Sequence, residues 1–378
     1  MRTELKNPTR RRIVIKAGSH VLSDHGQFAH PVVEGLADGM VRLIRQGNDV
    51  VFVASGAVIA GKIFTGMDRA LYPDHIKRPL AAIGQAALIT ECGHIFGRLD
   101  QPVGQILVGR DDFHHRERYL EIKNTLRALF RMNILPILNE NDSVATEDSS
   151  FGDNDNLAAQ LAGMLDADLL VLLSTVDGLY DGNPGHPGSR VIPLVNGITE
   201  GHLSEARYKG EHLASGGMPA KLAAIDKASH FGVPVILANG RASRVLARIF
   251  QGDDVGTYFQ PRTNPLRQRK RWLAYSTHVK GSLVVDDGTC AALTRGRASL
   301  LSSGIVEVRE HFGVRDVISI VSQSGEEIAR GLTNYDWNTL QQIAGLNSAQ
   351  LQARQWSEKI DEVVHRDNMV VLPAATGV

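Results

Sequence analysis

At 378 residues the chain is long enough for two or three domains that each bury a core, and 43% of its residues are hydrophobic, an ordinary globular share. Lysine plus arginine and aspartate plus glutamate number 41 each, so the overall charge favours neither nucleic acid nor a membrane surface as a partner. Two distant cysteines, Cys92 and Cys290, argue against a disulfide scaffold and a zinc ribbon and are typical of a reducing cytosol.

The N-terminal segment is basic, and the apolar run after it, residues 13–15, is too short for the core of a signal peptide. No run of about 18 apolar residues follows that would span a membrane. The 14 histidines form no motif of metal-ligand spacing. We therefore expect a cytoplasmic protein with no membrane contact and no metal site made by its own side chains.

Over the first 260 residues, short β-branched runs alternate with stretches of helical spacing, which predicts an α/β fold with a mainly parallel sheet sandwiched by helices. Expected strands are residues 13–16, 50–54, 105–108, 134–138, 169–173 and 233–238. Expected helices are residues 32–45, 80–99, 118–131, 156–165 and 218–231. Ligands of such folds bind at the carboxyl ends of the strands, so the residues that follow each strand matter most.

The pattern changes after residue 260, and we divide the chain into a first domain at 1–260, a basic linker at 261–276, a small β-rich domain at 277–360 and a tail at 361–378. The linker contains two prolines and a dense basic run with no acid. Strands are expected at 282–285, 305–309, 317–322 and 328–332, and the segment 323–326 between the last two predicts a hairpin. The tail has few structural cues.

The first strand ends in Lys16, followed by Gly18 and Ser19. A lysine at the carboxyl end of a parallel strand is well placed to meet an anion, although a surface lysine there is equally common. The second strand ends before Ser55, and Gly56 to Lys62 fits the spacing of a Walker A loop. Ile63 occupies the place of the magnesium-binding Ser or Thr, and apolar helix formers replace the loop. We therefore predict a helix whose N-terminus carries the Ser55 hydroxyl.

The fourth strand leads into a dense group of short acids and amides between residues 139 and 156. A solvated loop or a helix N-cap would explain part of this group but not all of it. Its candidate site residues are Asn139, Asp142, Asn154 and Asp155.

Two further segments are candidates for holding a nucleotide. Ser174 and Thr175 follow the fifth strand in a turn. A glycine-bearing segment opens the last helix and places a lysine beside the positive end of the helix dipole; it comprises Ser215, Gly216, Gly217, Met218 and Lys221. Two lysines with acids, amides and glycine-rich helix starts suit phosphoryl transfer, in which positioning and electrostatics supply most of the catalysis. No histidine or cysteine nucleophile is evident, which argues against a covalent enzyme intermediate.

Taken in order, these motifs resemble the amino acid kinase family, in particular its members that phosphorylate glutamate. The resemblance rests on the segments 16–19, 55–57, 139–142, 152–156 and 215–218, and it spans about residues 12 to 260. Segments 285–293 and 300–305 are similar to the PUA domain, a compact β-barrel that many bacterial members carry.

The resemblance implies transfer of the γ-phosphoryl group of ATP to the γ-carboxylate of L-glutamate, the first step of proline biosynthesis, with Mg²⁺ delivered by the nucleotide. It implies that Lys16 and Lys221 stabilise the transferring group and that Asp155 organises them. Glutamate would be held by Ser55, Asn139, Asp142 and Asn154, with Asp142 facing its α-ammonium. Nucleotide would be bound by Lys16, Ser174, Thr175 and the 215–221 segment. Proline as a feedback inhibitor, a homo-oligomer (dimer or tetramer) and coupling to glutamyl phosphate reductase are also implied.

The sequence departs from the family pattern at three places. Ser19-His20 stands where Thr-Ser is more usual, Ser215 replaces a threonine, and Thr175 stands where an aspartate is expected. The serine exchanges keep a hydroxyl, but Thr175 leaves its contact with nucleotide in question.

Two alternatives remain open on sequence alone. One is a kinase of the same fold that acts on aspartate, acetylglutamate or a nucleotide. The other is an RNA-binding protein, because PUA domains elsewhere bind RNA. Between Thr277 and Val378 nine basic residues face twelve acidic ones, a poor balance for binding phosphates, so RNA is not expected as a partner.

Overall fold

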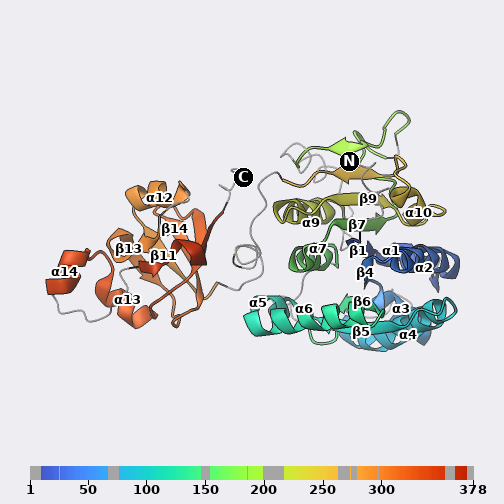
Figure 1. Cartoon of the computed structure of the whole chain (residues 1–378), viewed down its shortest axis with the longest axis horizontal. Coiled ribbons are helices and arrows are strands. Elements are labelled where there is room, and N and C mark those ends of the chain that lie inside the picture. Colours follow the sequence, from blue (N-terminus) through green and yellow to red (C-terminus); the bar gives the residue numbers. More distant parts are fainter. Residues whose placement is uncertain are drawn as a thin grey trace. The chain divides into compact units, whose positions relative to one another are not determined.

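The computed structural model describes residues 10–24, 26–66, 76–145, 154–184, 186–198, 217–262, 273, 279–295, 298–353 and 362–372. The chain divides into two compact units, Met1–Leu266 and Arg267–Val378 (Figure 1). Each unit has its own cluster of buried hydrophobic side chains. Among the described residues, no helix is both long and apolar enough to cross a bilayer.

The first unit is built on an eight-stranded sheet of order β5-β6-β4-β1-β7-β9-β10-β8. Six strands run parallel, and β10 pairs antiparallel with β9 and parallel with β8. The parallel strands are β1 (Arg12–Ala17), β4 (Asp49–Ala54), β5 (Val103–Val108), β6 (Leu135–Glu140), β7 (Leu169–Ser174) and β9 (Val235–Asn239). The other two are β8 (Leu194–Val195) and β10 (Thr257–Phe259). All six predicted strands are confirmed to within two residues.

Helices cover both faces of this sheet, as expected for strands that are apolar along their whole length. One face packs against α2 (His30–Arg45), α4 (Lys77–Gly97) and α10 (Val245–Phe250), and the other carries α7 (Asn154–Leu165) and α9 (Met218–His230) (Figure 1). The other helices among the described residues of this unit are α1 (Ser19–Leu22), α3 (Ala57–Thr65), α5 (Arg110–His114) and α6 (Arg116–Arg131), and β2 (Ser23–Asp24) pairs with β3 (Gln27–Phe28).

The segment that fits the Walker A spacing is helical, as predicted: α3 begins directly after Gly56, which lies in the left-handed region with φ of 112°. Helices α3 and α4 touch through two glycines. A side chain at Gly61 would strike the carbonyl of Leu80, and one at Gly84 would strike the carbonyl of Ala57. Gly61 therefore serves close helix packing.

The second unit contains a five-stranded sheet of order β13-β11-β14-β15-β17. Its strands are β11 (Gly281–Val285), β13 (Ile305–Arg309), β14 (Val317–Ser322), β15 (Glu327–Leu332) and β17 (Met369–Val371), and a separate ladder joins β12 (Leu300–Leu301) to β16 (Glu362–Val364). Helices α12 (Asp287–Thr294), α13 (Trp337–Ile343) and α14 (Ser348–Ala353) complete the unit. The four predicted strands and the β14–β15 hairpin are confirmed, with Gly325 in the left-handed turn position at φ of 86°.

The segment expected to be a tail after residue 360 contributes structure instead. β16 and β17 both come from it, and β17 pairs with β15 as an edge strand of the sheet. Each strand has only three residues, too few to show the alternation on which a strand is recognised in sequence.

The two cysteines lie in different units. Cys92, on α4, is 1% exposed, and burial followed by the charge of Glu91 raises its pKa to about 12. Cys290, on α12, is half-buried.

We expect Gly84→Ala to lower the free energy of unfolding of the first unit by about 3 kcal/mol, because the added methyl group meets the backbone of α3 and cannot be accommodated by a side-chain movement. Gly93→Ala on the same helix is the matched control: a Cβ there meets nothing within 4 Å, so helix propensity should raise stability by about 0.5–1 kcal/mol. Urea unfolding of both variants measures the difference, and equal stability would contradict the packing role of Gly84.

Candidate functional site

A buried cluster of three charged side chains lies at the carboxyl edge of the central strands. Asp155, in the first turn of α7, is fully buried; its Oδ1 forms an ion pair with Lys16 Nζ at 2.7 Å, and its Oδ2 accepts a hydrogen bond from Lys221 Nζ at 3.0 Å. Lys16 comes from the end of β1 and is 4% exposed, and Lys221 comes from the first turn of α9 and is 8% exposed. The structure thus brings together three of the predicted site residues from distant parts of the chain.

The electrostatics of the cluster keep Asp155 ionised. Burial alone would raise the pKa of its carboxyl group, but the charges and hydrogen bonds of Lys16 and Lys221 outweigh burial and lower the pKa below its usual range. One carboxylate between two ammonium groups leaves the cluster with a net positive charge. It is therefore suited to hold an anion.

A group of amides adjoins this cluster. Asn139, on β6, is 1% exposed, and its Oδ1 accepts the backbone N–H of Glu140 at 2.9 Å. Because a backbone N–H donates to an oxygen, that bond identifies Oδ1 of Asn139. The atom of Asn154 that lies 2.7 Å from Asn139 Oδ1 is therefore the donor Nδ2. Asn154 Nδ2 also donates to Ser55 Oγ at 3.0 Å. The predicted residues Ser55, Asn139 and Asn154 thus form one connected group.

The remaining oxygen of Asn154 is an open acceptor. Asn154 Oδ1 is buried and has no hydrogen-bond partner among the described residues. A buried acceptor without a donor is costly in a folded protein, by about 1–3 kcal/mol. Such an atom therefore marks a place where a ligand can donate.

Asp142, in the loop after β6, is half-buried. Burial, followed by the charge of nearby Glu140, raises its pKa to about 6. Glu140 itself is 5% exposed. A positively charged partner would stabilise the ionised form of this carboxyl group more than a neutral partner would.

The predicted nucleotide residues lie at the ends of β7 and α9. Ser174, the last residue of β7, is half-buried and Thr175 is exposed, while Gly217 and Met218 open α9. Ser215 and Gly216 lie outside the described residues.

Two residues near the site, Gln85 and Asn239, were not predicted from the sequence. Gln85, on α4, accepts Asn139 Nδ2 at 2.7 Å and so orients the amide group of β6. Asn239, at the end of β9, donates to Asp177 Oδ1 at 3.0 Å and links the turns after β7 and β9. The position of Asn239 directly after a buried strand could have identified it, whereas Gln85 lies within a helix and had no such signal.

Comparison with known proteins identifies the class of protein to which this fold and this site belong. The model of the amino acid kinase family matches residues 11–239, the PUA domain matches residues 281–354, and the chain belongs to the amino acid kinase family.

Individual relatives are more specific than the family model. The chain is 40% identical to a protein named glutamate 5-kinase from Geobacter sulfurreducens over 96% of this chain and 98% of that protein. It is 39% identical to one of the same name from Geobacter metallireducens over 98% and 100% of the two chains. Among solved structures, an N-acetylglutamate synthase from Neisseria gonorrhoeae resembles it with a TM-score of 0.50 and 16% identity, covering 70% of this chain and 62% of that one, which supports the fold alone.

We expect Asp155→Asn to lower the free energy of unfolding at pH 7 by about 3–5 kcal/mol, the usual cost of breaking a buried ion pair, because two buried lysines lose their counter-charge. The folded pKa of Asp155 is depressed, so its stabilisation is complete above the unfolded pKa of about 3.9 and is lost as the pH falls through the lower folded value. Urea unfolding should thus give the same difference at pH 7 and pH 5 and a smaller one below about pH 4.

The matched control is Asp38→Asn, which removes an exposed ion pair with Arg42 on α2 and should change stability by less than about 1 kcal/mol. An Asp155→Asn loss no larger than that of the control would show that the buried pairs do not hold the unit together.

Proposed function

We propose that the protein is a glutamate 5-kinase, which transfers the γ-phosphoryl group of ATP to the γ-carboxylate of L-glutamate and releases ADP and γ-glutamyl phosphate, the first step of proline biosynthesis. The observation that carries the proposal is the buried Lys16–Asp155–Lys221 cluster beside a group of amides with an open acceptor. The relatives with this name, similar over nearly the whole chain, support the same reaction.

The transfer needs no general base. The γ-carboxylate of glutamate has a pKa of about 4.3, so at neutral pH an oxygen of it attacks the γ-phosphorus directly while the bond from that phosphorus to the β-phosphate oxygen breaks. Asp155 is not a proton acceptor, since both its oxygens face lysines and its pKa is lowered. Lys16 and Lys221 neutralise charge on the oxygens of the transferring group, and Asp155 holds the two ammonium groups in place.

Glutamate is recognised by the amide group and by Asp142. The α-ammonium of an amino acid offers three donors and a positive charge, which match the open Asn154 Oδ1 and the carboxylate of Asp142. Ser55 and Asn139 complete the substrate side, and Gln85 keeps Asn139 oriented.

ATP lies toward β7 and α9 in this proposal. Ser174, Thr175 and the segment from Ser215 to Lys221 line its site, and the N-terminus of α9 directs backbone N–H groups and a positive dipole at the phosphates. Mg²⁺ would be held mainly by the phosphates of the nucleotide, where it would supply positive charge beside the transferring group. Among the described residues, no group of three or more His, Cys, Asp or Glu could hold a metal ion.

Three further properties belong to the proposal by resemblance to the family: feedback inhibition by proline, assembly into a homo-oligomer, and coupling to glutamyl phosphate reductase. The last follows from chemistry, because an acyl phosphate hydrolyses readily in water.

The reaction can be tested by measuring the release of ADP from MgATP. The acceptors to compare are glutamate, aspartate, acetylglutamate and uridylate, and hydroxylamine is added to trap any acyl phosphate. We expect ADP release and a hydroxamate with glutamate. Activity with another acceptor only would leave the fold standing and refute the substrate.

We expect Lys221→Ala to lower kcat about 10²- to 10³-fold, the usual cost of one preorganised charge contact, with the fold intact. Lys227→Ala is the control on the same helix: Lys227 Nζ donates to Asn156 Oδ1 and is not one of the three residues of the buried cluster, so kcat should stay within a few-fold of wild type. Wild-type turnover of Lys221→Ala would remove that lysine from the transfer step.

The raised pKa of Asp142 gives a pH prediction. The ammonium of glutamate binds the ionised carboxylate, so the KM for glutamate should rise about tenfold per pH unit below pH 6 and stay level above pH 7. Asp142→Asn should have a high KM that no longer varies with pH over this range. A wild-type KM that is constant from pH 5 to 7 would separate Asp142 from the substrate.

A further inference from the structure

Arg241 has more side-chain hydrogen bonds than its exposed position requires. Its guanidinium donates to His20 O through Nε at 3.1 Å and Nη2 at 2.8 Å, to Ser23 O at 2.7 Å, and to Asp24 Oδ1 at 3.0 Å. All three acceptors belong to the end of α1 and the residues just after it. Carbonyls at the end of a helix have no partner within the helix, and the planar fork of arginine can satisfy several at once.

The turn that Arg241 holds is the one that follows Lys16. It leaves β1 at Gly18, whose N–H donates to Leu173 O at 3.2 Å, and a Cβ added at Gly56 would lie 3.6 Å from Ser19 Cβ. The turn therefore lies between the end of β7 and the Ser55–Gly56 corner, next to the buried cluster. Its position decides where the backbone N–H groups and the Ser19 hydroxyl lie.

The backbone of Arg241 is tied to the nucleotide side of the proposed site. Its N–H donates to Asn239 Oδ1 at 2.9 Å, and Asn239 in turn donates to Asp177. The neighbouring Gly240 donates to Ser174 O at 2.9 Å, and a side chain there would strike Val21 of α1 and Leu173. One continuous set of hydrogen bonds thus runs from the turn after β7, through Arg241, to the turn after β1.

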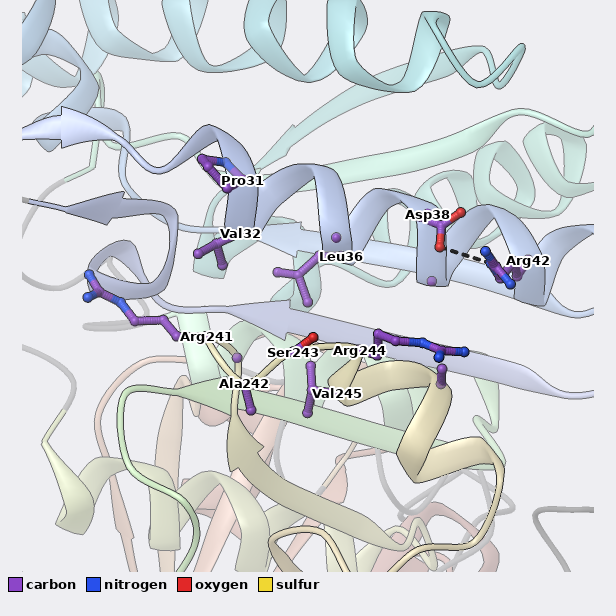
Figure 2. Close-up of a pocket in the computed structure, with 14 residues that line it drawn as sticks. Pro31, Val32, Leu36, Asp38, Arg42, Arg241, Ala242, Ser243, Arg244 and Val245 are labelled. Atoms are coloured by element: carbon purple, nitrogen blue, oxygen red, sulfur yellow. Dashed lines mark hydrogen bonds and ion pairs between the residues drawn. The ribbon is translucent and has the colours of Figure 1, made fainter.

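The loop that carries Arg241 borders a cavity. A cavity of about 330 Å³ lies between α2 and residues 240–245, and it is lined in part by Leu36, Gly39, Ala242 and Val245. Figure 2 shows Arg241 extended away from Arg244 and from the Asp38–Arg42 ion pair, which lie at the other end of this cavity. The close packing of Gly240 against Val21 and Leu173 and the bonds of Arg241 together set the position of this loop relative to α1, with open space on its other side.

We propose that Arg241 is a positioning residue that fixes the turn after β1 relative to the nucleotide end of β7 and β9, and so aligns the phosphoryl-binding turn with bound ATP. It acts through the backbone of residues 18–24. This role rests on the proposed kinase activity, and it assigns a part in that activity to the loop that carries Arg241.

The test compares Arg241→Ala, Arg241→Lys and Asp24→Asn in the full chain by steady-state kinetics and thermal unfolding. We expect Arg241→Ala to lower kcat about 10- to 100-fold with the KM for glutamate within about twofold, because a misplaced turn costs rate without removing a glutamate contact. Arg241→Lys keeps the charge near Asp24 but offers one nitrogen where the guanidinium uses Nε, Nη1 and Nη2, so it cannot make all four hydrogen bonds and should remain slow. Asp24→Asn, which leaves the carbonyl bonds in place, should keep most of the wild-type kcat.

Arg248→Ala is the matched control, because Arg248 is also a half-exposed arginine with one carboxylate partner, Asp253, on the same part of the chain. It should have wild-type kcat. Guanidinium ion, well below unfolding concentrations, should recover part of the kcat of Arg241→Ala, and ammonium ion should not. A kcat for Arg241→Ala equal to that of Arg248→Ala, or full recovery in Arg241→Lys, would overturn the proposal.

Hydrogen–deuterium exchange separates this inference from the proposed function. In Arg241→Ala the peptide covering residues 18–24 should exchange faster than in wild type and in Arg248→Ala, whether or not glutamate is the substrate. Unchanged exchange would refute the hold on the turn, whereas a wild-type protein inactive with glutamate would refute the proposed reaction alone.

Discussion

The double ion pair of Asp155 with Lys16 and Lys221 is the constraint on which the first unit depends. Placing three charges where water is excluded is favourable only if each finds its partner with good geometry. The fold meets this condition because β1 lies in the middle of the sheet, and both the first turn of α7 and the first turn of α9 reach its carboxyl end. The same arrangement gives the site its positive charge before any ligand arrives, so little reorganisation is needed at the moment of transfer.

On the proposed substrate side, the described residues leave two exceptions to the rule that buried polar groups are well paired. Asn139 has partners on its oxygen and on its nitrogen, while Asn154 has a buried oxygen without a donor among the described residues. Asp142 is the second exception, since burial and Glu140 make its ionised form costly. Local imperfections of this kind reduce stability and are expected where a protein binds its ligand.

Much of this could be predicted from the sequence, for physical reasons that also explain the failures. Buried parallel strands are apolar along their length, so β1, β4, β6 and β7 were evident, and the polar residue after each strand identified Lys16, Ser55, Asn139 and Ser174. The pairing of Lys16 with Asp155 depends on strand order, which residue spacing does not encode. Gln85 was missed because its role arises only when α4 packs beside β6, and β17 because three residues at a sheet edge have no periodic signal. Arg241 was missed for the same reason as Gln85: its partners are more than 200 residues away in the chain.

The different surroundings of the two cysteines have a practical consequence for spectroscopy. Only a thiolate reacts with maleimides and related reagents, and the buried Cys92 with its pKa raised to about 12 is protected on both counts. Cys290 is half-buried on α12 of the second unit, and burial, followed by the charges of Asp287 and Asp286, also raises the pKa of its thiol. It is still the more accessible of the two thiols, and it is remote in sequence from every residue of the proposed site. The natural chain therefore offers one preferred attachment point for a fluorophore or spin label, on the PUA domain, without any engineered cysteine.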